Sequence, residues 1–264
     1  MFETKRINNE VVKPVPLIEA ADTRPIKGHN LFSELYANIF LCSKKKSGKT
    51  STVYKVVQKC CGPKTCVLAF CSTLNKDPSW ATIRAWCERK GIPFIGQTSL
   101  KSDNGADLLD ELFTGLAAPE QLLKKTNILD SDDEDEAPER KPKYRSPEYL
   151  IILDDLSNEL KTASLTTLLK KNRHFKAKII LSSQYLNDML PGSRKQLDYF
   201  ILFRGHPKNK IEEIYRDADI SIPLEQFYQV YKFATLEPYS FLYIDCANGT
   251  FRRNFNESIL LSLT

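Results

Sequence analysis

Five short apolar runs, separated by longer amphipathic segments, constrain the fold of this chain more than any other feature. The runs are near-continuous rather than alternating, and they span residues 37–42, 65–71, 149–153, 177–181 and 199–203. Such runs are typical of strands in a parallel sheet with helices on both faces, because both sides of each strand are then buried. Helical patterns fill the gaps at 50–59, 78–90, 106–116, 159–171, 208–216 and 224–233. This order predicts an α/β fold with a mostly parallel central sheet.

The two ends of the chain differ from this pattern. Residues 239–245 and 250–255 flank Asn248-Gly249, a dipeptide that suits a type I′ turn, and they predict a C-terminal β-hairpin. Residues 11–30 contain three prolines, so we expect residues 1–30 to form an extended arm. A length of 264 residues favours one main domain, which we place at 31–264.

An acidic segment interrupts this domain. Residues 130–147 contain three prolines and no aliphatic side chain larger than alanine, which predicts a disordered insert. Its first ten residues hold seven acids, so the net charge of +5 leaves +12 on the rest of the chain. That excess favours a polyanionic partner, although a lysine-rich soluble surface would give the same charge.

The cysteine count and the hydropathy indicate in which compartment the protein works and whether it crosses a membrane. Seven cysteines cannot all pair, and reduced thiols in an intracellular compartment fit better than a disulfide framework. The apolar runs are far shorter than the roughly 20 residues that span a bilayer, so we expect no membrane span. The charged amino terminus lacks the apolar stretch of a secretory signal.

A phosphate-binding pattern follows the first apolar run. The octapeptide SKKKSGKT at 43–50 joins a strand to a helix, the setting of a P-loop that binds ATP with Mg²⁺. In such loops backbone N–H groups and the helix N-terminus hold phosphates, a lysine reaches the terminal phosphates, and a hydroxyl holds the metal. Here Lys49 and Thr50 fill the last two places, and Ser43 stands where a glycine is usual. The predicted nucleotide-binding residues are Ser43, Lys44, Lys45, Lys46, Ser47, Gly48, Lys49, Thr50 and Ser51.

Polar residues end two later strands. Asp154 follows an apolar strand and is placed to hold Mg²⁺, and Asp155 is placed to polarise an attacking water. Glu159 is a weaker candidate for that base, and an N-cap for the following helix is the competing interpretation of Asp155. Gln184 follows the next strand and is predicted to sense the γ-phosphate or orient the water, unless it belongs to an ordinary polar turn.

The order of these motifs resembles the FtsK and HerA superfamily of DNA-pumping ATPases. The stretches SKKKSGKT, YLIILDDL, KKNRHFKAKIILSSQ, LPGSRKQLDYFILF and FLYIDCANGTFRRNF carry the resemblance. The spacing of the motifs and the Arg173-His174 pair, which precedes the predicted strand before Gln184, are most similar to those of certain genome-packaging ATPases. These are the ATPases of poxviruses, other large eukaryotic DNA viruses, virophages and polinton-like viruses. The similarity covers about residues 30–255, and it implies a P-loop NTPase core of the RecA-like ASCE type.

The resemblance also implies a mode of action. Motors of this kind form rings, commonly of about five or six subunits, and drive double-stranded DNA into a preformed capsid. It implies docking on a capsid or vertex protein, in the cytoplasm of the host cell or in the virion. An arginine from one subunit often completes its neighbour's site, and Arg173 and Arg194 are the candidates, Arg173 being favoured. A surface position or a contact with DNA phosphate is an equally good interpretation of either arginine.

Other sequence features bear on the DNA contact and on rival functions. We expect basic side chains near the loop ends of the core to contact DNA phosphates whatever the DNA sequence. These side chains are Lys161, Lys170, Lys171, Lys176, Arg194 and Lys195. A small P-loop kinase is one alternative, although no lid segment with clustered arginines is evident. A non-hydrolysing nucleotide-binding scaffold of the virion is the other, with Ser43 as a sign of a decayed loop.

Overall fold

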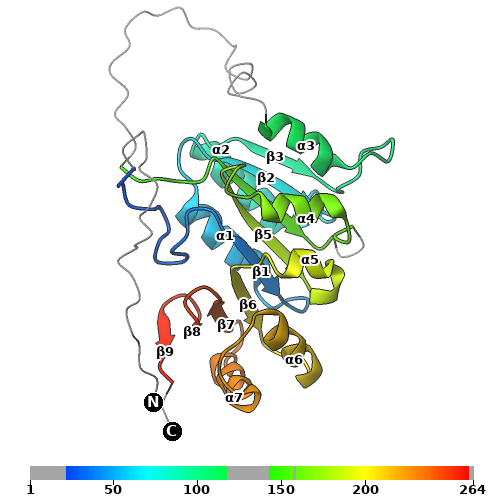
Figure 1. Cartoon of the computed structure of the whole chain (residues 1–264). Helices are drawn as coiled ribbons and strands as arrows, with labels where there is room; N and C mark the ends of the chain where they lie inside the picture. The colour runs from blue at the N-terminus through cyan, green and yellow to red at the C-terminus, as the bar shows by residue number, and fades with distance from the viewer. Residues whose placement is uncertain (1–21, 118–142, 157–158, 262–264) are drawn as a thin grey trace, which may run out of the picture.

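A computed structural model describes residues 22–117, 143–156 and 159–261, and in these residues one nine-stranded sheet organises the chain (Figure 1). The strand order is β3-β2-β4-β5-β1-β6-β7-β8-β9. The first six strands are parallel, and the last three are antiparallel to their neighbours. The predicted α/β fold with a mostly parallel sheet is confirmed. The strands are β1 (Asn38–Cys42), β2 (Cys66–Cys71), β3 (Phe94–Gln97), β4 (Tyr149–Asp154), β5 (Ala177–Ser183), β6 (Tyr199–Phe203), β7 (Phe241–Asp245), β8 (Thr250–Arg253) and β9 (Glu257–Ile259).

Helices cover both faces of the sheet, as Figure 1 shows. Side chains of α1 and α2 pack with one face in one apolar cluster, and side chains of α3, α4, α6 and α7 pack with the other face in a second. The helices are α1 (Lys49–Cys60), α2 (Pro78–Arg89), α3 (Leu108–Ala117), α4 (Ala163–Lys170), α5 (Pro191–Arg194), α6 (Lys208–Asp217) and α7 (Leu224–Ala234), with a 3₁₀ turn at Leu186–Asp188.

The strands are apolar at nearly every position because helices cover both faces of the sheet. In β1, Ile39 and Leu41 belong to the cluster under α1 and α2, whereas Phe40 belongs to the cluster on the opposite face. Alternate residues of a strand point to opposite faces, so a strand covered on both must be apolar throughout. Each fully buried aliphatic or aromatic side chain contributes about 1.5–3 kcal/mol relative to exposure.

Several element bounds differ from the sequence predictions. α4 begins at Ala163 rather than at residue 159, because the Thr162 side chain caps it by accepting the N–H of Leu165. β3 was not predicted, since only alternate residues of this short strand are partly buried and it lies at the sheet edge. β9 was also not predicted, because its three residues are mostly exposed.

The C-terminal hairpin of β7 and β8 and its predicted connection through Asn248-Gly249 are confirmed, but the type I′ turn expected at this dipeptide is wrong. Asp245 pairs with Thr250, so four residues form the connection. The Asp245 carboxylate accepts the backbone N–H of Asn248 at 3.0 Å and its side-chain Nδ2 at 2.9 Å. Gly249 has φ 61° and is the one connection residue with positive φ, whereas a type I′ turn requires two.

The topology gathers the ends of four parallel strands at one edge. β5 lies between β4 and β1, and β6 lies on the other side of β1. We call the edge where these four strands end the carboxyl edge and the opposite one the amino edge. In open α/β sheets ligands bind at the carboxyl edge. None of the helices in the described ranges is long and apolar enough to cross a bilayer.

The predicted division at residue 30 and the predicted disordered insert stay predictions. Residues 1–21 and 118–142, which hold most of both segments, lie outside the described part of the chain. Within the described part, Ile26 and Arg145 form a parallel β-bridge, so the ends of the two segments lie side by side at the sheet's amino edge.

Candidate functional site

The loop between β1 and α1 has the backbone of an anion-binding turn. Gly48 adopts φ 96° and precedes α1, and Lys46 adopts φ 62°. Ser43 is buried, does not have a positive φ, and donates its N–H to Ser183 O at 3.2 Å. A serine therefore fits the place where a glycine is usual, because the left-handed conformations fall on residues 46 and 48. The Oγ atoms of Ser43 and Ser47 are buried without a hydrogen-bond partner among the described residues.

Lys49, the first residue of α1, connects this loop to the acids at the end of β4. Its Nζ lies 2.9 Å from Asp154 Oδ1 and 3.3 Å from Asp155 Oδ1. Burial lowers the pKa of Lys49, but attraction to the two carboxylates outweighs burial, so this pKa is raised above its usual value. The ammonium is therefore charged at neutral pH. It stands between the phosphate-binding loop and the two acids.

The two acids occupy different environments. Asp154 is 2% exposed, and its Oδ2 accepts a weak hydrogen bond from Cys71 Sγ at 3.7 Å. Asp155 is partly exposed and adopts φ 58°, with its N–H donated to Ser182 O at 3.2 Å. A buried carboxylate oxygen is a ligand that Mg²⁺ accepts, whereas a partly exposed carboxylate can reach water. Asp155 is not the N-cap of α4, so that competing interpretation is wrong.

β5 places Gln184 beside these groups. Ser183 is in register with Cys42 at the end of β1, and Ser182 is in register with Asp154 at the end of β4. Gln184 follows directly and is partly exposed, and its backbone O accepts Lys210 Nζ at 2.8 Å. The glutamine thus directly follows β5, the strand that lies between β1, which leads into the P-loop, and β4, which ends in Asp154.

Glu159 has a different task in this structure. Its Oε2 accepts the hydroxyl of Ser99 at 2.8 Å and the backbone N–H of Leu100 at 2.6 Å. These bonds tie the connection before α4 to the segment after β3. A carboxylate held in this way is poorly placed to activate a water, so Asp155 remains the candidate base.

The two candidate arginines are not brought to the nucleotide edge. Arg173 is exposed and precedes β5, so it lies at the amino edge, opposite the P-loop. Arg194 is held inside its own chain, with Nη1 at 3.4 Å from Asp217 Oδ2 and 3.7 Å from Glu213 Oε1. Its Nε also donates to Met189 O at 3.0 Å. Arg194 is therefore already neutralised, whereas Arg173 is exposed to a partner.

The segment after β6, residues 204–206, also lies at the carboxyl edge, and no motif in the sequence predicts it. His206 is buried, and its Nε2 lies 3.1 Å from Cys42 O at the end of β1. Burial lowers the pKa of His206, which keeps the imidazole neutral at neutral pH. A β-carbon on Gly205 would lie 3.7 Å from Lys44 Nζ, and exposed Arg204 precedes it. The signal that could have found this segment is the β1–β6 pairing, because residues after a strand next to the P-loop strand share its edge.

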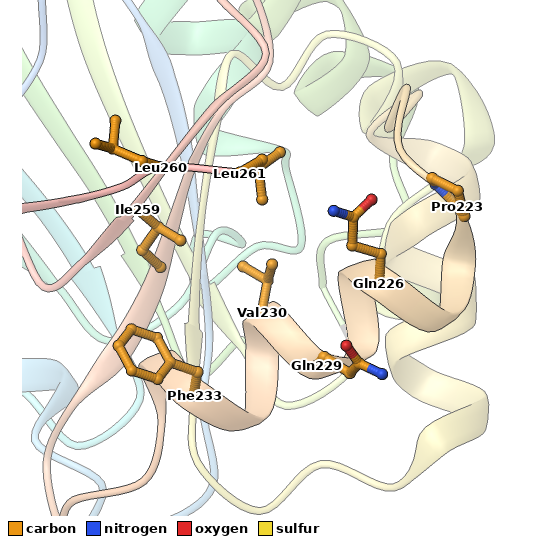
Figure 2. A pocket seen from close by; sticks show the side chains of 8 residues that line it. All are labelled: Pro223, Gln226, Gln229, Val230, Phe233, Ile259, Leu260 and Leu261. Atoms are coloured by element: carbon orange, nitrogen blue, oxygen red, sulfur yellow. The ribbon is translucent and has the colours of Figure 1, made fainter. Parts of the chain in front are cut away.

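Two pockets flank these elements. One, of about 560 Å³, adjoins the start of α1 and is lined by Gly48, Ser51, Thr52, Lys55, Tyr239, Phe241 and Phe255. The other, of about 600 Å³, lies between α7 and the end of the described chain, where Figure 2 shows Ile259, Leu260 and Leu261 near Val230. The lining of this second pocket carries no charged side chain, so it does not suit phosphates.

Comparisons with known proteins find similarity to viral proteins and to packaging ATPases. A model of the poxvirus A32 protein family matches residues 123–237, a span that includes Asp154, Asp155, Arg173 and Gln184 but begins after the P-loop. An uncharacterized protein, 075L, of Invertebrate iridescent virus 6 is 31% identical over 103 residues. That match covers 38% of this chain and 40% of the relative, so the chain spans about two fifths of its length.

Solved structures share the fold. The genome packaging NTPase B204 from Sulfolobus turreted icosahedral virus 2 in complex with AMP matches with a TM-score of 0.54 and 18% identity. The match covers 83% of this chain and 96% of that one. B204, the DNA-packaging ATPase from Sulfolobus turreted icosahedral virus, matches with a TM-score of 0.54 and 19% identity, over 82% of this chain and 95% of that one. The predicted P-loop ATPase fold is confirmed, and so is the resemblance to viral packaging ATPases.

Proposed function

We propose that this chain, a relative of the viral genome-packaging ATPases, hydrolyses ATP with Mg²⁺ and uses the energy to move double-stranded DNA into a preformed capsid. One observation carries the ATPase proposal: Lys49 Nζ lies within 3.3 Å of the carboxylates of both Asp154 and Asp155. A phosphate-binding lysine, a buried acid and a solvent-accessible acid thus meet at one point of the carboxyl edge. That is the set of groups that hydrolysis of a γ-phosphate requires.

Each group has a role in this reaction. The backbone N–H groups of residues 43–48 and the N-terminus of α1 bind the phosphates, and Lys49 moves from the acids to the terminal phosphate as nucleotide enters. Asp155 accepts the proton of the attacking water, and Gln184 orients that water or reads the γ-phosphate. Thr50 and Asp154 would hold Mg²⁺, which neutralises charge on the phosphates when bound.

We propose that exposed basic side chains at the amino edge contact the DNA. Lys170, Lys171 and Lys195 are exposed there, whereas Lys176 is paired with Glu148 at 2.6 Å. The Asn38 side chain donates to both Leu169 O and Gln196 O, which fixes the ends of α4 and α5 beside each other. These basic side chains would bind DNA phosphates whatever the DNA sequence, so binding to duplex DNA should weaken steeply as the salt concentration rises. A flat salt response would contradict this mode of contact.

A ring of subunits is proposed from the position of Arg173. Because this arginine lies at the amino edge of its own sheet, it can meet a nucleotide only across a contact with another subunit. A ring commonly has about five or six copies, and docking on a capsid or vertex protein would place the motor in the infected cell or the virion. Mixing Arg173→Ala with Lys49→Ala subunits tests this proposal. Recovery of ATP turnover in the mixture supports action in trans, and no recovery contradicts it.

The first experiment measures ATP hydrolysis with Mg²⁺ at low salt, with and without linear duplex DNA. We expect stimulation by DNA in the wild type and in Lys59→Ala, an exposed lysine on the last turn of α1 that serves as the matched control. Lys49→Ala should abolish turnover under both conditions. Stimulation by a nucleoside rather than by DNA would favour a kinase, and tight ATP binding without phosphate release would favour a scaffold.

A further inference from the structure

An aromatic pocket adjoins the P-loop on the side away from the acids. It has a volume of about 560 Å³ and is lined on one side by Tyr239, Phe241 and Phe255, around β7. The other side is lined by residues of the loop and α1, namely Gly48, Ser51, Thr52 and Lys55. β7 lies beyond β6 from the P-loop strand, whereas β5 and β4 with the acids lie on the other side of that strand. Phe241 pairs with Phe203, the last residue of β6, so the pocket opens at the carboxyl edge. The site and the pocket therefore share one edge and flank the same loop.

The pocket has a fixed apolar floor and an exposed aromatic wall. The Phe241 ring packs against the rings of Phe255 and Phe203, with centroids 5.0 Å and 5.3 Å away, and Phe241 is 5% exposed. Tyr239 is 72% exposed, and a β-carbon on Gly48 would lie only 3.5 Å from its Cδ1. The floor is thus held by packing, whereas the Tyr239 ring stands in solvent directly beside the P-loop.

The backbone of Tyr239 also departs from ordinary geometry. It adopts φ 64°, a left-handed conformation that is uncommon for an aromatic residue and costs energy relative to the right-handed one. In this conformation the ring lies beside Gly48 and lines the pocket together with Ser51. An exposed aromatic ring held in this way is a feature that folding alone does not explain.

We propose that this pocket binds the base of the nucleotide, which stacks on Tyr239. Lys49 marks the terminal phosphate next to the acids, and the pocket lies on the opposite side of the loop, where the nucleoside end must extend. Ser51 and Lys55 are four residues apart on one face of α1, so they line the way from the phosphates to the pocket. Aromatic lining with a few polar groups is typical of such sites. The inference rests on the proposed function, because it assigns a part of the same nucleotide site.

The test compares a ligand that has a base with one that lacks it. Calorimetric titrations with Mg-ATP and with Mg-tripolyphosphate would use the full chain as wild type, Tyr239→Ala, Tyr239→Phe and Tyr144→Ala. Tyr144 is also an exposed tyrosine, but it lies outside the pocket, so its variant is the matched control. We expect Tyr239→Ala to weaken ATP binding by about five- to a hundredfold, the range of base stacking on an aromatic ring, and to leave tripolyphosphate binding within about twofold. Tyr239→Phe and Tyr144→Ala should bind both ligands as the wild type does.

A spectroscopic measurement supports the same comparison. The triphosphate of 2-aminopurine riboside should lose fluorescence on binding to the wild type and to Tyr239→Phe, because stacking quenches the base, but not when bound to Tyr239→Ala. Equal losses of ATP and tripolyphosphate binding in Tyr239→Ala would overturn the assignment, since the tyrosine would then support the loop. Unchanged ATP binding in this variant would overturn it and leave the P-loop proposal intact. If the wild type bound neither ligand, the proposed function itself would fail, and the base assignment would fall with it.

Discussion

The charge of Lys49 should stabilise the protein even without nucleotide, because it compensates a buried carboxylate. Asp154 is 2% exposed, and the Lys49 side chain, 2.9 Å away, is 19% exposed. At an effective dielectric constant of about 20, two unit charges at this distance attract by roughly 6 kcal/mol, and desolvation of both groups offsets much of that. Removing one partner of a buried pair costs about 3–5 kcal/mol. We expect Lys49→Met, which keeps the apolar stem, to lower the free energy of unfolding by about 3 kcal/mol.

Urea unfolding of the nucleotide-free protein at neutral pH measures this loss. Lys59→Met, an exposed lysine of the same helix, should change the free energy of unfolding by no more than about 0.5 kcal/mol. The double variant Lys49→Met/Asp154→Asn removes both charges and should recover part of the loss, which a double-mutant cycle resolves. A loss below about 1 kcal/mol in Lys49→Met, or strict additivity in the cycle, would refute the compensation argument.

The pH dependence follows from the raised pKa of Lys49. Burial lowers this pKa, but the attraction of Asp154 and Asp155 raises it more, so the folded state holds the proton more tightly than the unfolded state does. The stabilisation is therefore fully present below the unfolded pKa and is lost as pH rises through the folded one. The difference between the wild type and Lys49→Met should be constant from about pH 6 to pH 9 and should shrink only in more alkaline solution.

Three further predictions concern single side chains. Asp155→Asn should lower ATP turnover by about 10²–10⁴-fold with ATP affinity retained, because it removes only the proposed base, and single-turnover kinetics would check this. Gly48→Ala should cost about 1–2 kcal/mol of stability and weaken nucleotide binding, because its φ of 96° strains any side chain; wild-type affinity would contradict this. Asn38→Ala should cost about 2–3 kcal/mol in urea unfolding and spare ATP binding, because it removes the hydrogen bonds to Leu169 O and Gln196 O far from the P-loop.

The parts of the fold that burial dictates could be predicted from the sequence. β6 was predicted with the bounds that the structure shows, because every one of its five residues is buried and the run is apolar throughout. β3 and β9 could not be predicted in this way. They are the two outermost strands of the sheet, in which fewer positions are buried and the apolar signal is correspondingly weak.

The candidate site was predictable only as far as motifs reach. Lys49, Asp154 and Gln184 each follow or precede a recognisable strand, and the pairing of β4, β5 and β1 then brings them together. His206 and Tyr239 carry no local motif. They lie at the same end of the sheet because β6 pairs with β1 and β7 pairs with β6, and this order is set by contacts between residues far apart in the sequence. The roles of all these residues in catalysis stay predictions until they are measured.

The position of Arg173 constrains any assembly that uses it. The arginine precedes β5 and the P-loop follows β1, so the length of a parallel strand separates them within one subunit. No rotation of side chains in one chain closes that distance, since each strand residue advances about 3.3 Å. If Arg173 acts on a phosphate, that phosphate must therefore be bound by a second copy of the chain. A twofold contact can do this only if one surface carries both Arg173 and the P-loop, and otherwise the contact joins two different surfaces and closes into a ring or continues as a filament. If Arg173 completes the site, ATP turnover must accordingly require a second copy, and a monomer with full ATP turnover would exclude that role.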